Sequence, residues 1–445
     1  MVNEIRNLTH GPIFKQLLKM AMPLMAINFL QMAYTLTDMA WLGHLSSKDI
    51  AAVGAIGIVI WLLESLALTT KRGAEIKIAQ HIGANLLSEA RKYASHNLSI
   101  SFIMGITISF LLWVFSDPVI SLFRLEQDVA DLAKNYLQIV CFSFPTVFLS
   151  LTFTGIFNGL GRPEIPFYYS STGFIFNMIL DPLLIYGYAG LPRFGIEGAA
   201  IATMISQFTV LSLFIWKTKA KGGVLNRFPY FIRLQKKHSF EIFKIGLPNA
   251  LLSCVHASTN LFTASIASIF GGHIGVMSQT TGGQIEGICW HAADGFSSAL
   301  GAFVAQNHAA KKTERTIKAY KYTLFALLIL GFVVSCFFYF FGNEIFSLFV
   351  NEKTAVTAGG DYLKIVAFCQ VFMVVEITAM GMWNGYGNSV PPSIVSIIFN
   401  VARIPMALLF GKLMGITGVW WALTISCMLK GIVSPVWWYF RYSHK

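Results

Sequence analysis

Residues 155–182, GIFNGLGRPEIPFYYSSTGFIFNMILDP, place polar side chains inside an apolar stretch. A second copy of this stretch follows at residues 381–405, which read GMWNGYGNSVPPSIVSIIFNVARIP. Five positions match at one constant offset, and these are Gly155, Asn158, Gly159, Gly161 and Pro166 in the first copy and Gly381, Asn384, Gly385, Gly387 and Pro392 in the second. The chain is therefore predicted to be an internal duplication.

Composition places both copies in a membrane. Of the 445 residues, 55% are hydrophobic, 14% are aromatic and only 12% are charged. Such a chain has too little polar surface to cover a soluble globule, and its apolar runs repeatedly reach the ~20 residues that a spanning helix needs. We expect an all-α polytopic membrane protein with twelve transmembrane helices. The predicted spans are residues 15–43, 50–80, 94–116, 130–158, 165–188, 195–217, 241–268, 276–306, 318–342, 360–386, 392–411 and 416–440.

The twelve predicted helices fall into two six-helix lobes. The amino-terminal lobe comprises residues 1–217, a cytoplasmic inter-lobe linker comprises residues 218–240, and the carboxy-terminal lobe comprises residues 241–445. Each half begins on the same side of the membrane, so the repeats are parallel and related by an axis along the membrane normal. Two pseudo-symmetric bundles of this kind suit alternating access better than a passive channel.

The charge distribution reports membrane topology. The formal net charge is +12, but the Lys and Arg residues lie mostly at the chain ends and in connectors after even-numbered helices. The positive-inside rule then predicts both termini in the cytoplasm, and the charge implies no nucleic-acid partner. The six cysteines lie inside apolar segments without paired spacing, so neither a disulfide framework nor a thiolate metal site is indicated.

Two acids lie at membrane depth in the amino-terminal lobe, where an ionisable group costs about 2.5 to 3.5 kcal/mol. Asp38 lies in the first predicted helix, while Asn177 and Asp181, four residues apart, share a face of the fifth. Two carboxylates with amide and hydroxyl neighbours are able to share one proton or to coordinate Na⁺. The alternative is that Asp38 lies at the outer interface and Asp181 caps a helix break before Pro182.

Other polar residues of this lobe are secondary candidates. Gln31 and Tyr34 share a face of the first helix with Asp38, which makes them possible substrate contacts. Asn158 ends the fourth helix and Thr203 lies within the sixth. Taken alone, Asn158 and Thr203 are interpreted as packing residues, because small polar side chains often join membrane helices.

The carboxy-terminal lobe carries a second set, a possible substrate or second cation site: His256, Asn260, Glu286, His291, Asp294, Glu376 and Arg403. Glu376 lies mid-span in VFMVVEITAMG, where a protonatable acid suits ion coupling or cation binding. The alternative is a structural ion pair with Arg403. His256 and His291 are interpreted as satisfied polar residues rather than pH switches.

The second predicted helix has an unusual charged end. Lys71, Arg72, Glu75 and Lys77 lie near its cytoplasmic terminus, where pairing of Lys71 with Glu75 would lower the cost of burial. We interpret this cluster as a solvated inner mouth, with substrate contact as the alternative.

Motifs for other chemistry are missing from the sequence. There is no Walker A loop, HExxH motif, nucleophile elbow or metal-spaced Cys pair, so we expect neither an enzyme nor a resident cofactor. A membrane-embedded transferase acting on a lipid phosphate would need an acidic cluster on an interfacial loop, and the sequence has none.

Along essentially its whole length the chain resembles the MATE (multidrug and toxic compound extrusion) transporters, and their DinF-like bacterial branch in particular. The segments that carry the resemblance are Pro23 with the following DMAWLGHLSSKDIAAVGA, IAQHIGA at 78–84, GIFNGLGRP at 155–163, NMILDP at 177–182 and GIEGAAIAT at 195–203. The resemblance implies two six-helix bundles, export of small organic molecules, and coupling to inward movement of protons or Na⁺. It implies a monomer in the inner membrane of a prokaryote.

The resemblance also implies roles for residues. The branch's amino-lobe cation or proton site corresponds to Asp38, Asn158, Asn177, Asp181 and Thr203, and Glu286 and Glu376 resemble acidic positions of the carboxy-terminal lobe. The KRGAEIK sequence before AQHIGA departs from the family pattern and, with Arg403, adds basic groups. A flippase for lipid-linked sugars, or an exporter of another amphipathic anionic cargo, is therefore the alternative function.

Overall fold

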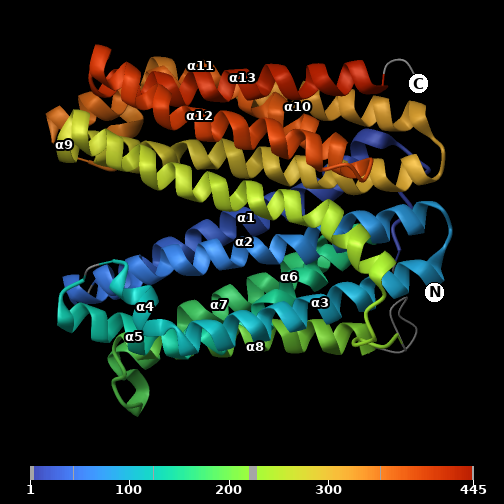
Figure 1. The fold of residues 1–445 in the computed structure, drawn as a ribbon, viewed down its shortest axis with the longest axis horizontal. Helices are drawn as coiled ribbons and strands as arrows, with labels where there is room; N and C mark the ends of the chain where they lie inside the picture. Colours follow the sequence, from blue (N-terminus) through green and yellow to red (C-terminus); the bar gives the residue numbers. More distant parts are fainter. Residues whose placement is uncertain (1–4, 44, 124, 220–227, 351, 443–445) are drawn as a thin grey trace. The chain divides into compact units, whose positions relative to one another are not determined.

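The structure is a computed structural model, and it describes residues 5–43, 45–123, 125–219, 228–350 and 352–442. Residues 220–227 of the predicted linker lie outside the described residues, as do the chain ends at 1–4 and 443–445. Helices make up nearly all of the described chain (Figure 1). They are α1 (Ile13–Gly43), α2 (Ser47–Gly83), α3 (Leu87–Val114), α4 (Ser116–Ser121), α5 (Gln127–Cys141), α6 (Phe144–Gly159), α7 (Glu164–Tyr186), η2 (Tyr188–Gly190), α8 (Ile196–Lys219), α9 (Lys236–Ala309), α10 (Thr313–Ser347), α11 (Lys353–Gly385), α12 (Val390–Met414) and α13 (Ile416–Tyr442).

These helices supply the twelve predicted spans. Within the described residues, nine helices are long and apolar enough to cross a membrane. We assign two of the predicted spans to α9. Its 74 residues correspond to about 110 Å of helix, far more than one bilayer, and the helix breaks at Gly272 (φ 58°, ψ −151°), a conformation that only glycine adopts readily. The bent pair α5 and α6 and the 23-residue α7 complete the set.

The fourth span differs from its prediction as one helix over 130–158. The structure breaks it between Cys141 and Phe144, and α5 meets α6 at an angle of 51°. Pro145 lies in the first turn of α6, where its missing N–H and its ring oppose continuation of the preceding helix. The apolar run by itself did not locate this break.

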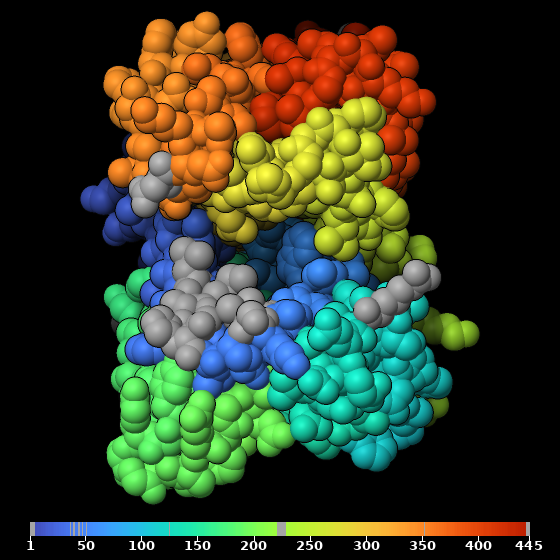
Figure 2. All heavy atoms as spheres, turned by 90° about the vertical axis from the view of Figure 1, so that its left-hand side faces the viewer, coloured from blue at the N-terminus to red at the C-terminus, as the bar shows by residue number. Residues whose placement is uncertain are grey.

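The chain divides into two compact units. The first unit holds Ala26–Ala250 and the described residues up to Asn7, and the second holds Leu8–Met25 and the described residues from Leu251 onward. Thus α1 gives its first half to the second unit, and α9 gives its first turns to the first unit. Figure 2 shows the helix ends of the first unit in cyan and green and those of the second in orange and red.

Two glycines at the start of residues 155–182 bring two helices of the first unit together. A Cβ atom on Gly155 would lie 2.2 Å from the carbonyl oxygen of Lys71, and one on Gly159 would lie 2.7 Å from that of Glu75. Both distances are shorter than van der Waals contact, so these positions of α6 accept only glycine against the backbone of α2. Small residues at four-residue spacing commonly allow such close packing in membranes.

The second copy repeats this packing. A Cβ atom on Gly381 would lie 2.6 Å from the carbonyl oxygen of Ser297, and one on Gly385 would lie 2.8 Å from that of Gly301. The glycines of α11 therefore fit against α9 as those of α6 fit against α2. The turn that follows is also repeated, since Gly161 and Gly387 both have φ of 75°.

Much of the outer surface is apolar. Large side chains are exposed on the helices, among them Phe110, Phe325, Phe332, Leu413 and Phe440. An aqueous surface rarely exposes apolar area of this extent, whereas helices that face lipid do.

Candidate functional site

Two carboxyl groups meet in the first unit. Asp38 lies on α1 and Asp181 on α7, and their side chains interact directly. Asp181 is completely buried, and the Oδ1 atom of each carboxyl accepts no hydrogen bond from the described residues. Because two carboxylates in contact repel each other strongly in a low dielectric, such a pair favours binding of a proton or a metal cation.

Neutral side chains orient this carboxyl pair. The Nδ2 atom of Asn177, one turn before Asp181 on α7, donates to Asp181 Oδ2 at 2.9 Å. The Oδ1 atom of Asn177 accepts the backbone N–H of Thr203 on α8 at 3.1 Å. Tyr34 of α1 lies beside the same threonine, with its hydroxyl 3.5 Å from Thr203 Oγ1. Three helices, α1, α7 and α8, therefore meet at the carboxyl pair. Asp38, Asn177, Asp181 and Thr203 lie together there.

Tyr136 also belongs to this place, although it was not predicted from the sequence. This buried tyrosine of α5 lies within electrostatic range of Asp38, Asp181 and Glu64. Its signal was available in the repeat, because Tyr136 matches Tyr362 of the second copy.

Two predicted candidates of the first unit lie elsewhere. Asn158 is buried in the last turn of α6, next to the part of α2 that holds Glu75, and not beside the carboxyl pair. Gln31 lies on α1 with an exposed side chain. Of the five residues predicted for the amino-lobe site, the structure therefore brings four together, and Asn158 is the exception.

A buried ion pair lies in the second unit. Glu376 of α11 pairs with Lys430 of α13 at 3.3 Å, and Ser396 of α12 donates to the same carboxyl at 2.5 Å. The alternative of an ion pair between Glu376 and Arg403 does not hold among the described residues. Lys430 was missed as a partner because 54 residues separate it from Glu376 in the sequence, and only the packing of α11 on α13 brings the two together.

The other acid of this set has neutral partners. Glu286 of α9 accepts hydrogen bonds from Gln370 Nε2 at 3.1 Å and from the Tyr362 hydroxyl at 3.3 Å. The repeated tyrosine therefore lies beside an acid in both units. His256 and Asn260, one turn apart on α9, are in contact with a separation of 3.1 Å between Nε2 and Nδ2.

His291 and Asp294 lie further along α9. They are one turn apart and within electrostatic range of each other, and the His291 ring packs edge-on against Trp290. Glu286 and Asp294 lie two turns apart on the same helix.

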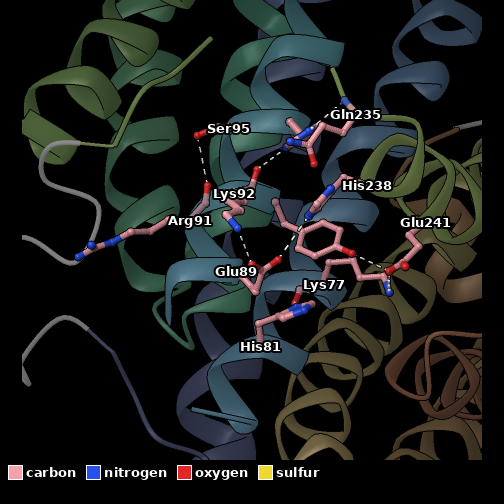
Figure 3. Close-up of polar contacts among 11 residues, drawn as sticks. Lys77, His81, Glu89, Arg91, Lys92, Ser95, Gln235, His238 and Glu241 are labelled. Carbon is pink, nitrogen blue, oxygen red and sulfur yellow. Dashed lines mark hydrogen bonds and ion pairs between the residues drawn. The ribbon is translucent and has the colours of Figure 1, made fainter. Parts of the chain in front are cut away.

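The charged end of α2 joins a polar network with the start of α9 (Figure 3). Arg72 pairs with Glu75 at 3.0 Å, while Lys77 reaches Glu241 of α9 at 2.5 Å. The hydroxyl of Tyr93 on α3 donates to the same carboxylate at 2.6 Å. Arg72 and Lys77 thus have ion-pair partners within the first unit.

Histidines continue this network along α3. The rings of His96 and His238 stack with centroids 4.5 Å apart, and His238 Nε2 lies 3.4 Å from Glu89 (Figure 3). His96 Nδ1 lies 2.8 Å from the Lys92 carbonyl, and its Nε2 accepts the backbone N–H of Gln235 at 3.2 Å. Because a carbonyl only accepts, Nδ1 carries the hydrogen, and His96 is neutral in this arrangement.

Loss of the Glu241 carboxylate is expected to destabilise the first unit. Glu241→Gln removes the charge that neutralises Lys77, whose side chain is only 14% exposed, and weakens the acceptor of Tyr93. We expect a loss of ~1–3 kcal/mol in stability, measured by thermal unfolding in detergent. The control is Asp128→Asn, which breaks an exposed pair with Lys48 and is expected to leave the unfolding temperature unchanged. Equal unfolding temperatures for the two variants would contradict a stabilising role for Glu241.

A metal centre of the usual type is not seen in the described chain, where no group of three or more His, Cys, Asp or Glu side chains gathers as ligands. The carboxyl pair of Asp38 and Asp181 is instead a two-acid site with amide and hydroxyl neighbours.

Comparison with known proteins identifies the family of the chain. The family model described as MatE matches residues 23–183 and again residues 248–409, one match in each copy of the repeat. The chain is similar to the probable multidrug resistance protein NorM of Thermotoga maritima, with 27% identity over 415 residues that cover 92% of this chain and 88% of that protein. It is similar to the FAD transporter of Shewanella oneidensis, with 25% identity, 97% of this chain and 95% of that protein.

Solved structures share the fold. An outward-facing multidrug resistance MATE family transporter of the MOP superfamily superposes with a TM-score of 0.89 at 25% identity, covering 98% of each chain. A MATE crystal structure in the bent conformation superposes with a TM-score of 0.91 at 24% identity, covering 98% of this chain and 97% of that one.

Proposed function

Because the chain belongs to the MatE family of membrane transporters, we propose that it exports small organic molecules by antiport with protons or Na⁺. The observation that carries the proposal is the direct contact of Asp38 with Asp181 inside an apolar helix bundle. Members of this family are transporters rather than enzymes, and the bacterial relatives place the chain in a plasma membrane as a multi-pass protein. We further propose a monomer with both termini in the cytoplasm.

The carboxyl pair has two states in this mechanism. With both groups ionised, Asp38 and Asp181 repel each other, and one proton or one Na⁺ relieves the repulsion. Asn177 donates to Asp181, and because the Thr203 backbone holds the Asn177 amide, this donor keeps its position in both states. The pair therefore gains or loses one positive charge at a fixed place in the first unit.

Occupancy of the pair is coupled to conformation. Pro182 follows Asp181 inside α7, and Pro23 lies inside α1, which also carries Asp38. Each proline removes one helical hydrogen bond, so each helix bends there at lower cost than elsewhere. A bound cation shifts the population between conformations only by its difference in affinity for them, and the substrate acts in the same way in the opposite direction.

Transport under imposed gradients tests this function. Purified protein in proteoliposomes is given a proton gradient or a Na⁺ gradient separately, and efflux is followed for two fluorescent substrates, the cation ethidium and the anion riboflavin 5′-phosphate. We expect efflux to be accelerated by one of the two gradients, and dissipation of that gradient by an ionophore to return efflux to the rate of empty liposomes. Equal flux with and without both gradients would exclude antiport.

A further inference from the structure

Among the described residues of the second unit, the buried guanidinium of Arg403 forms no ion pair. Glu376 pairs with Lys430 and accepts a hydrogen bond from Ser396, while Glu286 accepts hydrogen bonds from Gln370 and Tyr362. Glu376 therefore has an ion-pair partner, whereas Glu286 has only neutral hydrogen-bond donors. The Arg403 guanidinium lies within electrostatic range of Glu286 without forming an ion pair with it in the described chain.

Arg403 is buried with few acceptors. Its side chain is on α12, the residue is 5% exposed, and its Nη2 atom donates to Asn400 Oδ1 across a long 3.4 Å. The Nε atom is buried and has no acceptor among the residues that the structure describes. A guanidinium has five N–H donors, so most of the hydrogen-bonding capacity of Arg403 is unused by the protein.

An arginine has no other way to relieve this burial. A buried acid, histidine or lysine is able to shed its charge by gaining or losing a proton, whereas a guanidinium stays charged in proteins. An uncompensated buried charge is costly, so a charge of this kind inside a membrane indicates a functional partner. A planar oxyanion, either carboxylate or phosphate, matches the guanidinium with two parallel hydrogen bonds.

The repeat shows that the positive charge is specific to the second unit. The element NMILDP at 177–182 corresponds to NVARIP at 400–405, with the same asparagine and proline at its ends. Where the first copy has Leu180 and Asp181, the second has Arg403 and Ile404. One helix element therefore presents an acid in the first unit and a base in the second.

A histidine of α9 interacts electrostatically with Arg403. His256 of α9 lies within electrostatic range of both Arg403 and Lys430. When the Asn260 amide donates to His256 Nε2, the ring hydrogen is on Nδ1. The neutral His256 ring then offers one N–H donor in addition to those of the guanidinium. The side chains of His256 and Glu286 are only partly buried, so the group around Arg403 is not sealed on every side.

We propose that Arg403 binds the carboxylate or phosphate group of an anionic organic cargo, with His256 as a second donor. This inference rests on the proposed export function but concerns cargo recognition in the second unit, away from the carboxyl pair. It assigns the two charge clusters different tasks: ion coupling in the first unit and recognition of an anion in the second.

A matched pair of ligands tests the proposal. Riboflavin and riboflavin 5′-phosphate share one fluorescent ring system and differ by a phosphate, so their binding to detergent-solubilised protein is compared by fluorescence anisotropy at pH 7 without any ion gradient. We expect wild-type protein to bind the phosphate ester at least ~10-fold more tightly than riboflavin. A difference in affinity of this size corresponds to the contribution of a hydrogen bond to a charged group. Equal affinity for the two ligands would overturn the proposal.

Two variants separate recognition from folding. Arg403→Gln is expected to remove the ~10-fold preference, while Arg441→Gln, the same change at an exposed arginine near the end of α13, is expected to retain it. The Arg403→Gln protein is expected to unfold without ligand at the same temperature as wild type or at a higher one, because the change removes an unpaired buried charge. If Arg403 had a structural role, the Arg403→Gln protein would unfold at a lower temperature than wild type. A lower unfolding temperature together with a retained preference for the phosphate ester would refute anion binding.

A lipid headgroup carries the same phosphate chemistry and is tested as a separate source. The titration is repeated in nanodiscs of phosphatidylcholine with and without phosphatidylglycerol. We expect similar affinities in both. A phosphatidylglycerol-dependent loss of binding in wild type, but not in Arg403→Gln, would assign the site to lipid and reject cargo recognition.

The binding assay also separates this inference from the transport mechanism. Binding needs no ion gradient, so a protein that shows no antiport but binds the phosphate ester through Arg403 would refute the export proposal alone. Antiport without a phosphate preference would refute the recognition proposal alone.

Discussion

Asp38→Asn and Asp181→Asn are each expected to reduce ion-driven efflux by about 100-fold, at the upper end of the coupling energies typical of linked sites. Asparagine keeps the size of the side chain but neither ionises nor binds a proton in exchange. In the proposed mechanism, Asp38 and Asp181 repel each other until a proton or Na⁺ binds between them. When one of the two is replaced by neutral asparagine, this repulsion is lost, and the remaining acid no longer drives binding of the ion. The measurement is efflux from proteoliposomes under the gradient that drives the wild-type protein.

The same variants are expected to remain folded. Asp181 is fully buried and its Oδ1 atom receives no hydrogen bond from the described residues, so removing its charge does not break an ion pair. The control for efflux is Asp128→Asn, an identical change at an exposed acid of α5 that pairs with Lys48, and it is expected to keep the wild-type rate. Wild-type efflux in both pair variants would reject the carboxyl pair as the coupling site.

Gly155→Ala is expected to have the largest effect on stability. The added Cβ atom would lie 2.2 Å from the carbonyl oxygen of Lys71 and 2.9 Å from its carbonyl carbon, so α6 and α2 must move apart. Overpacking of this kind costs typically ~1–3 kcal/mol, and more where backbone rather than a side chain must move. The unfolding temperature in detergent and the yield of monodisperse protein measure this loss.

The second copy supplies an internal repetition of that experiment. Gly381→Ala would place a Cβ atom 2.6 Å from the Ser297 carbonyl oxygen and is expected to destabilise the protein in the same direction. Gly54→Ala is the matched control, because nothing lies within 4 Å of the added atom and alanine favours helix more than glycine does. If Gly155→Ala were as stable as Gly54→Ala, the close packing of α6 on α2 would be wrong.

Local chemistry explains why the first-unit site was predictable. Asn177 and Asp181 are four residues apart, which puts them on one face of a helix whatever else that helix contacts. An acid at membrane depth is costly enough to indicate function by itself, and this argument selected Asp38 and Asp181 together. Asn158 is also a polar residue within an apolar run, but it lies in the last turn of α6, as its predicted place at the end of the fourth helix indicated.

Partner choice in the second unit was not predictable in this way. The sequence offered Arg403 as the partner of Glu376, and the structure pairs Glu376 with Lys430 instead. The rotation of α11, α12 and α13 about their axes decides which side chains meet, and the hydrophobic pattern of helices buried on several sides defines that rotation poorly. The unpaired state of Arg403, on which anion recognition depends, was therefore visible only in three dimensions.

The sequence by itself determined the membrane class, the spans and the duplication, because bilayer thickness sets the length of an apolar helix and a repeat is visible in the residues themselves. Tertiary structure decided which polar groups contact one another and how the two units are composed. The first turns of α9 belong to the first unit, where Gly246 packs against the backbone of Thr69. Such contacts depend on shape complementarity between helices distant in sequence, and neither residue periodicity nor composition encodes that information directly.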